Sequence, residues 1–152
     1  VMAAAVVTRL AFAKTDVVQM LNGCIGGLVA ITAEPLMPSP LAAILIGAVG
    51  GVIVVYGTKF LLSLKIDDVV GAIPAHLFAG IWGTLAVPIT NPDAAFGTQL
   101  LGVVSINVFV FAVSFVIWFL MKNTFGIRLS KEGELKGTDV TETGVIAYAI
   151  RD

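Results

Sequence analysis

The stretch VVGAIPAHLFAGIWGTLAVPI, residues 69–89, decides the fold class because it is long enough and apolar enough to cross a bilayer as one helix. It contains His76, the single histidine of the chain. An ionisable side chain is costly at membrane depth, where it faces other protein groups or a water-filled cavity. We therefore interpret His76 either as a conduction or proton-handling residue or as a histidine that hydrogen-bonds between helices.

The composition places the whole chain in a membrane. Of its 152 residues, 58% are hydrophobic and 12% charged, and the mean hydropathy is +1.01. Soluble domains carry about a quarter charged residues. The net charge of −1, with no dense basic tract, argues against a nucleic-acid partner. Cys24 is the single cysteine, which excludes an internal disulfide and a thiol cluster, and no metal or cofactor is indicated.

The predicted fold is all-α, a polytopic membrane helix bundle. Four stretches approach or exceed the twenty or so residues of a span, at about 17–33, 41–64, 69–89 and 98–121. Residues 1–12 look like the end of a further helix, so we expect the carboxy-terminal part of a longer protein. The transmembrane bundle is predicted over 1–122. Residues 123–152, which are richer in glycine and charge, form a predicted tail.

Lysine and arginine predict the orientation of the bundle. With four full spans, one side of the membrane receives Arg9, Lys14, Lys59, Lys65, Lys122, Arg128, Lys131, Lys136 and Arg151, which are all nine cations. The opposite side holds Glu34 and Asp93 and no cation. The positive-inside rule therefore predicts that the carboxy-terminal tail is cytoplasmic.

Glycines and isolated polar residues lie inside the spans. Pairs at helix-packing spacing are Gly23 with Gly27, Gly47 with Gly51, and Gly80 with Gly83. We expect them to pack helices within the chain. Polar residues at or near membrane depth are Asn22, Thr32, Thr84, Gln99 and Asn107. We expect most of these to bond between helices and one or two to line a pore.

An enzyme is not expected. No second histidine or carboxylate pair lies within a span, and Ser105 and Ser114 have no partner base. Asp67 and Asp68 precede the helix that bears His76. We expect them to cap its amino end, with a role at the cytoplasmic mouth of a pore as the alternative.

Three segments, in this order, resemble the Amt/Mep/Rh ammonium transporter family, and bacterial Amt proteins in particular. They are NGCIGGLVAIT at 22–32, IDDVVGAIPAH at 66–76 with GIWGTL at 80–85, and the tail pattern GTD at 137–139, ETG at 142–144 and AY at 147–148. The resemblance covers nearly the whole chain. The chain departs from the common pattern at residues 77–79, where small residues are usual, and at Thr143, where a histidine is frequent.

The resemblance implies a homotrimer of eleven-helix protomers, built from two inverted five-helix repeats and a long last helix. This chain would supply the end of helix seven, helices eight to eleven and the tail. His76 would be the second of two paired pore histidines, and its partner lies outside these residues. The implied function is an ammonium transporter or channel of the bacterial inner membrane that deprotonates ammonium and passes ammonia through a hydrophobic pore.

The tail is implied to take part in regulation. Its motif residues are Gly137, Asp139, Glu142, Gly144 and Tyr148, and family tails of this kind contact neighbouring protomers and PII signalling proteins. Two alternatives stay open. The protein could be an Amt-like ammonium sensor, or a structural membrane subunit without flux in which His76 serves as interhelical glue.

Overall fold

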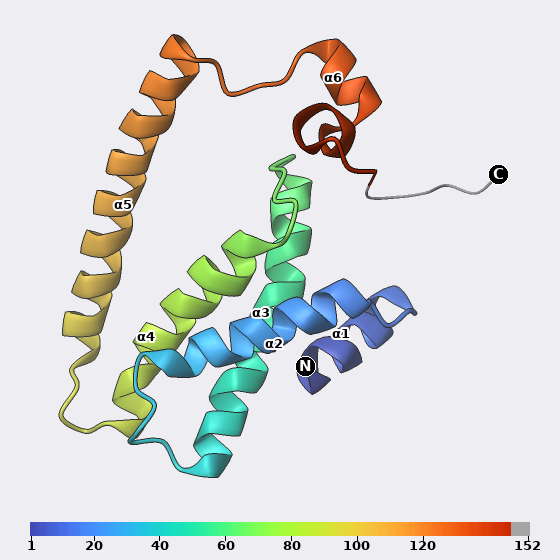
Figure 1. The fold of residues 1–152 in the computed structure, drawn as a ribbon. Helices are drawn as coiled ribbons and strands as arrows, with labels where there is room; N and C mark the ends of the chain where they lie inside the picture. Colours follow the sequence, from blue (N-terminus) through green and yellow to red (C-terminus); the bar gives the residue numbers. More distant parts are fainter. Residues whose placement is uncertain (147–152) are drawn as a thin grey trace. The chain divides into compact units, whose positions relative to one another are not determined.

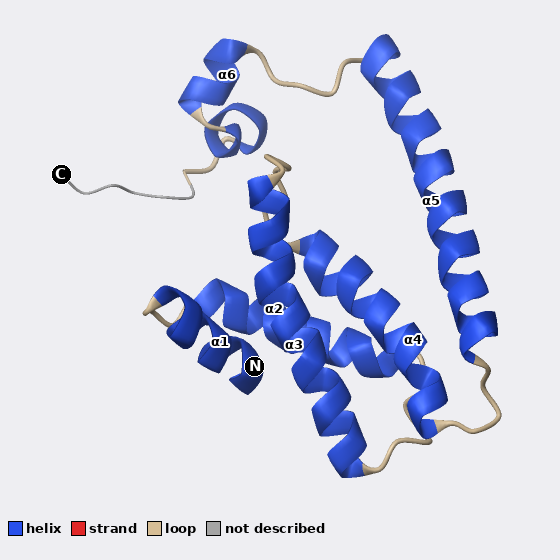
Figure 2. Cartoon of the chain, turned by 180° about the vertical axis from the view of Figure 1, so that it is seen from behind, coloured by secondary structure: helices blue, strands red, loops and turns tan. Residues whose placement is uncertain are grey.

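The computed structural model describes residues 1–146, and within them it contains helices and no strand (Figures 1 and 2). The elements are α1 (Met2–Phe12), α2 (Val17–Thr32), α3 (Pro40–Ser63), the π-helix η1 (Ile73–Phe78), α4 (Ala79–Thr90), α5 (Phe96–Thr124), α6 (Lys131–Lys136) and the π-helix η2 (Asp139–Thr143). The expected all-α class is confirmed.

Three helical segments of this part of the chain are long and apolar enough to cross a membrane: Pro40–Ser63, Ile73–Thr90 and Phe96–Thr124. The first predicted span, at about 17–33, corresponds to α2, which has 16 residues and rises about 24 Å, and so is shorter than the three segments above. The segment Ile73–Thr90 is the least apolar of the three, and α5 is the most apolar.

The chain divides into two compact units, Val1–Asn107 and Val108–Asp152. The first contains α1 to α4, η1 and the beginning of α5. The second contains the rest of α5, α6 and η2. The boundary predicted at residue 122, between a membrane bundle and a tail, remains a prediction.

In the first unit, α2 and α3 pack through glycines (Figure 1). Gly27 and Gly47 lie against each other's backbone, and a Cβ added to either would meet the other's carbonyl oxygen at 3.2–3.3 Å. Gly50 faces the backbone of Gly26 in the same way. Such contacts let two helix backbones approach closely, which is how helices associate in lipid. The expected packing within the chain is present, and Gly26 and Gly50 extend it beyond the predicted pairs.

A small apolar cluster joins α4 to this pair of helices. Ala30, Ile46 and Ala86 are buried together, and Trp82 packs against them while its indole N–H donates to the Ile46 carbonyl at 3.0 Å. Gly83 lies directly on the backbone of Ala30. The helix that follows η1 is thereby fixed against both α2 and α3.

The two ends of the first unit differ in charge. At one end, Lys59 lies over the Phe12 ring at 5.4 Å, and the unit's other cations, Arg9, Lys14 and Lys65, are in the segments that meet there. At the other end, the Asn91 side-chain amide donates to Glu34 at 3.1 Å, and the Asp93 N–H donates to the Asn91 side-chain oxygen at 3.0 Å.

Within the described residues, the second unit consists of the greater part of the apolar helix α5, followed by the short helices α6 and η2. No side chain of α5 is buried, and Phe111, Phe115 and Phe119 stack along it with centroids 6.2 Å apart. After α5, Arg128 binds Glu134 through two hydrogen bonds of 2.6 and 3.1 Å. This pairing lowers the pKa of the Glu134 carboxyl and raises the pKa of Arg128, because the side-chain hydrogen bond favours both charged forms.

Candidate functional site

His76 lines an open pocket of about 350 Å³ in the first unit. One wall comes from η1 and α4, with Leu77, Gly80, Ile81 and Thr84, and the other from the start of α5, with Gln99, Gly102, Val103, Ile106 and Asn107. The pocket is mainly apolar, with the imidazole, one hydroxyl and two amides as polar groups. Such a lining can admit a small solute and offer it a few hydrogen bonds.

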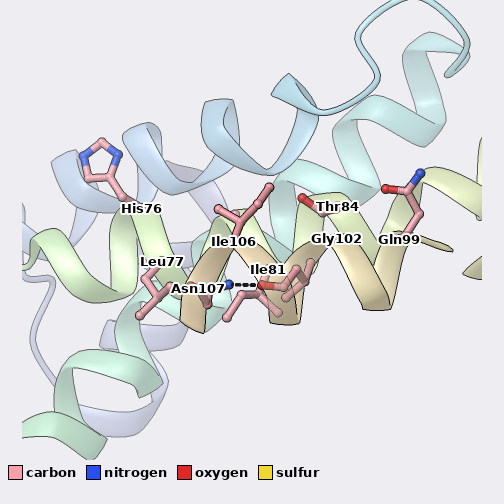
Figure 3. Close-up of a pocket in the computed structure, with 10 residues that line it drawn as sticks. His76, Leu77, Ile81, Thr84, Gln99, Gly102, Ile106 and Asn107 are labelled. Carbon is pink, nitrogen blue, oxygen red and sulfur yellow. Dashed lines mark hydrogen bonds between the residues drawn. The ribbon is translucent and has the colours of Figure 1, made fainter. Parts of the chain in front are cut away.

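The imidazole of His76 is exposed in this chain and forms no hydrogen bond within residues 1–146 (Figure 3). The single hydrogen bond drawn among the lining residues joins the Asn107 amide to the Val103 carbonyl at 2.7 Å. Both ring nitrogens of His76 are therefore available to a solute. A neutral imidazole offers one donor and one acceptor.

The helix that bears His76 begins later than predicted. The sequence predicted a span from residue 69, whereas η1 begins at Ile73, so His76 is its fourth residue. Gly71 has a φ of +73°, which breaks the helix before this point. His76 is thus in the first turn of its helix instead of the second.

Asp68 fixes the amino end of η1. Its carboxylate oxygens accept hydrogen bonds from the backbone N–H groups of Ala72 and Ile73, at 2.9 and 2.8 Å. A carboxylate at this place satisfies amides that have no partner inside the helix and complements the helix dipole. Asp67 is exposed at the protein surface.

η1 is seated on α3. A Cβ added to Gly57 would meet Pro74 and Phe78 at 2.7–2.9 Å, so the absent side chain leaves room for both residues. Pro74 and Ala75 are buried. His76 lies between Pro74 and Phe78 in sequence, and these two contacts hold its backbone from α3. π-helical turns of this kind are frequent at functional sites.

The predicted tail residues lie in the second unit. Gly137 has a φ of +99° and precedes η2, and Gly144 ends η2 with a φ of +67°. The Asp139 carbonyl accepts the N–H of Val145 at 3.0 Å, and Glu142 lies within η2. Tyr148 lies outside the described residues. The role of this motif in regulation remains a prediction.

The sequence analysis identified the polar residues of the pocket as separate candidates, but it did not predict which apolar residues line the pocket with them. Leu77, Gly80, Ile81 and Thr84 follow the spacing i, i+3, i+4, i+7, and so do Gln99, Gly102, Val103 and Ile106. Each set is one face of a helix. The signal was present, but choosing these faces requires knowing which helices are neighbours. No group of three or more metal-ligating side chains occurs in residues 1–146.

Comparison with known proteins gives a family match and a set of similar transporters. Residues 1–148 match the model of the Ammonium Transporter Family. The chain is 34% identical to ammonium transporter Amt2 of Archaeoglobus fulgidus over 93% of its length, and 36% identical to ammonium transporter Amt1 of Haloferax mediterranei over 96%. It is 32% identical to an ammonium transporter of Bacillus subtilis over 89%. The chain spans 29–37% of the length of these relatives.

Proposed function

Because this chain belongs to the ammonium transporter family, we propose that the full-length protein moves ammonium across the cell membrane and that His76 lines its pore. Membership makes the protein one of a family of transporters and supports ammonium as the solute. The pore role of His76 is supported by one observation: His76 lines an open, mainly apolar pocket, and both of its ring nitrogens are without a hydrogen bond within the described residues.

Electrostatics favours a mechanism in which ammonium loses its proton. Moving such an ion from water into a medium of dielectric constant near 4 has an idealised cost of about 20 kcal/mol, which a few neutral polar groups do not offset. Neutral ammonia avoids this cost and can hydrogen-bond to an imidazole as it passes apolar walls such as Leu77 and Ile81. Hydrated sodium and potassium ions have no proton to lose. The same pore therefore discriminates against them.

The charge distribution supports an orientation with the tail in the cytoplasm. Arg9, Lys14, Lys59 and Lys65 belong to one end of the first unit, and the other end carries Glu34 and Asp93 and no cation. The positive-inside rule places the cationic end inside the cell. In this orientation the tail motif is available to a cytoplasmic regulator, and a homotrimer in the inner membrane with PII control is part of the proposal.

Uptake of ¹⁵N-labelled ammonium tests the proposal. The full-length protein, reconstituted in vesicles, should take up label down an ammonium gradient, and His76→Ala should reduce the rate at least tenfold, the size of effect expected when a group that handles a proton is removed. Asn123→Ala is the control, since Asn123 is exposed near the end of α5 and bonds only to the Phe119 carbonyl. No uptake by well-inserted wild-type protein would contradict transport.

A second substitution separates a pore role from a packing role. If His76 only held helices together, His76→Gln would leave uptake intact, because glutamine supplies a donor and an acceptor of similar reach. A pore role predicts that this variant loses uptake while the folded protein keeps its thermal stability. Ammonium binding without any flux would favour a sensor.

A further inference from the structure

The starting observation is a buried asparagine that bonds outside its own helix. Asn22 in α2 is 9% exposed, and its side-chain Nδ2 donates to the backbone carbonyl of Val70 at 2.8 Å. The two residues are 48 positions apart. Asn107 and Asn123, by contrast, donate to the carbonyl four residues earlier in their own helix. Asn22 therefore ties α2 to a segment that is distant in sequence.

That segment sets the start of the His76 helix. Val70 precedes Gly71, whose positive φ turns the chain, and the Gly71 carbonyl accepts the N–H of Ala75 at 3.2 Å to open the helix. A Cβ at Gly71 would collide with the Asn22 amide. Glycine is thus needed here both for the backbone conformation and for the close approach of Asn22.

The direction of the His76 Cα–Cβ bond, and so the side on which the ring projects, is set by the backbone, because the ring forms no hydrogen bond within residues 1–146. The backbone is held at three places. Asp68 caps the helix start, Gly57 of α3 seats the residues on either side of His76, and Asn22 holds the turn six residues before it. Of these three residues, Asn22 is the one that belongs to α2.

We infer that Asn22 is a positioning residue for His76: its hydrogen bond to the Val70 carbonyl fixes the turn at Gly71 and so the direction in which the imidazole faces the pocket. The inference rests on the proposed transport function. Removing the amide leaves a partly buried carbonyl without its donor and frees the turn. The Cα–Cβ bond that carries the ring would then lose its fixed direction, although the ring itself is unchanged.

The test uses Asn22→Leu, which keeps the side-chain size and removes the donor. The matched control is Thr58→Val. It removes a longer contact, at 3.4 Å, from the Thr58 hydroxyl to the side-chain oxygen of Gln19 in α2, one turn from Asn22, together with the bond of the same hydroxyl to the Val54 carbonyl of its own helix at 2.9 Å. We expect Asn22→Leu to lower the maximal uptake rate about tenfold, the fold-change that corresponds to the loss of one hydrogen bond. Thr58→Val should stay within about twofold of wild type, since its distant partner is weakly bound.

A labelling experiment reports the position of residue 76 without relying on transport. His76→Cys is made in a full-length background free of other cysteines, with Cys24→Ala, and the rate of reaction with a small water-soluble maleimide is measured. Adding Asn22→Leu should change this rate roughly threefold or more, because thiol reactivity follows exposure. Adding Thr58→Val should leave it unchanged. If Asn22→Leu fails to insert, Asn22→Ser replaces it, since serine is too short to reach Val70.

The outcomes separate the inference from the function on which it rests. An unchanged labelling rate in the Asn22 variant overturns the inference, even if uptake falls. A changed rate together with a loss of uptake supports it. If the wild-type protein takes up no ammonium, the transport proposal fails, and the labelling rate alone still decides whether Asn22 positions residue 76.

Discussion

Gly50 provides a direct test of the packing between α2 and α3. Gly50 and Gly51 are neighbours in α3, and alanine at either position has the same effect on the helix propensity, a gain of up to about 1 kcal/mol over glycine. Their surroundings differ. A Cβ at Gly50 would lie 2.7 Å from the Gly26 carbonyl oxygen and 2.9 Å from the Ala30 Cβ, whereas at Gly51 the nearest atom is 3.6 Å away.

The expected difference follows from these distances. The atoms facing Gly50 belong to the backbone and a short side chain of α2, which cannot rotate away, so α2 and α3 must separate. Forcing extra atoms into a packed contact costs about 1–3 kcal/mol. Because the propensity term is common to both variants, Gly50→Ala should be less stable than Gly51→Ala by this amount, about 1–3 kcal/mol.

The measurement is the free energy of unfolding of the full-length protein in mixed micelles, obtained by titration with a denaturing detergent. Wild type, Gly50→Ala and Gly51→Ala are compared under identical conditions. We expect Gly51→Ala to match or exceed wild type. Equal stability of the two alanine variants would refute the close backbone contact between Gly50 and Gly26.

Three further changes test other parts of the structure. Asp68→Ala removes the cap of the His76 helix and should destabilise the protein by about 1 kcal/mol, seen as a lower unfolding free energy, while Asp68→Asn retains part of the cap. Trp82→Phe loses the hydrogen bond to Ile46 and should cost about 0.5–1.5 kcal/mol in the same assay. The Arg128–Glu134 pair should be intact at neutral pH and be lost as the pH falls through the lowered pKa of Glu134, because only the carboxylate accepts both bonds. Amide exchange in α6, compared with the intrinsic rate at each pH, should show less protection in acid than at neutral pH. Unchanged protection in Glu134→Gln at neutral pH would argue against this role of the pair.

The helical class and the positions of the spans could be predicted because they depend on local pattern. The apolar run before Lys65 has the length of a span, and Pro40 after Ser39 marks the start of α3, where the Ser39 hydroxyl accepts the Ala42 N–H at 3.3 Å. Proline at the first helical position and serine just before it are a usual helix start. Such signals lie within a few residues of the boundary they set.

The late start of the His76 helix could not be predicted in the same way. Val69 and Val70 are apolar and read as part of the span, but the turn at Gly71 is held by Asn22 from another helix. The composition of the pocket lining could not be predicted for the same reason, since it also depends on which helices are neighbours. His76, Thr84 and the two amides were visible in the sequence as isolated polar residues, and only the packing of helices shows which of them share a pocket.

The contrast between the segment Ile73–Thr90 and α5 has a consequence for how the protein enters the membrane. α5 has the highest hydropathy of the three segments and buries no side chain, so it can partition into lipid on leaving the translocon without help from neighbours. The segment Ile73–Thr90 carries an imidazole and two prolines and is less apolar. This segment inserts more favourably when α2 and α3 are already in the membrane to pack against it. Because α2 and α3 precede it in the chain, they are synthesised first, and the order of synthesis matches the order that insertion favours.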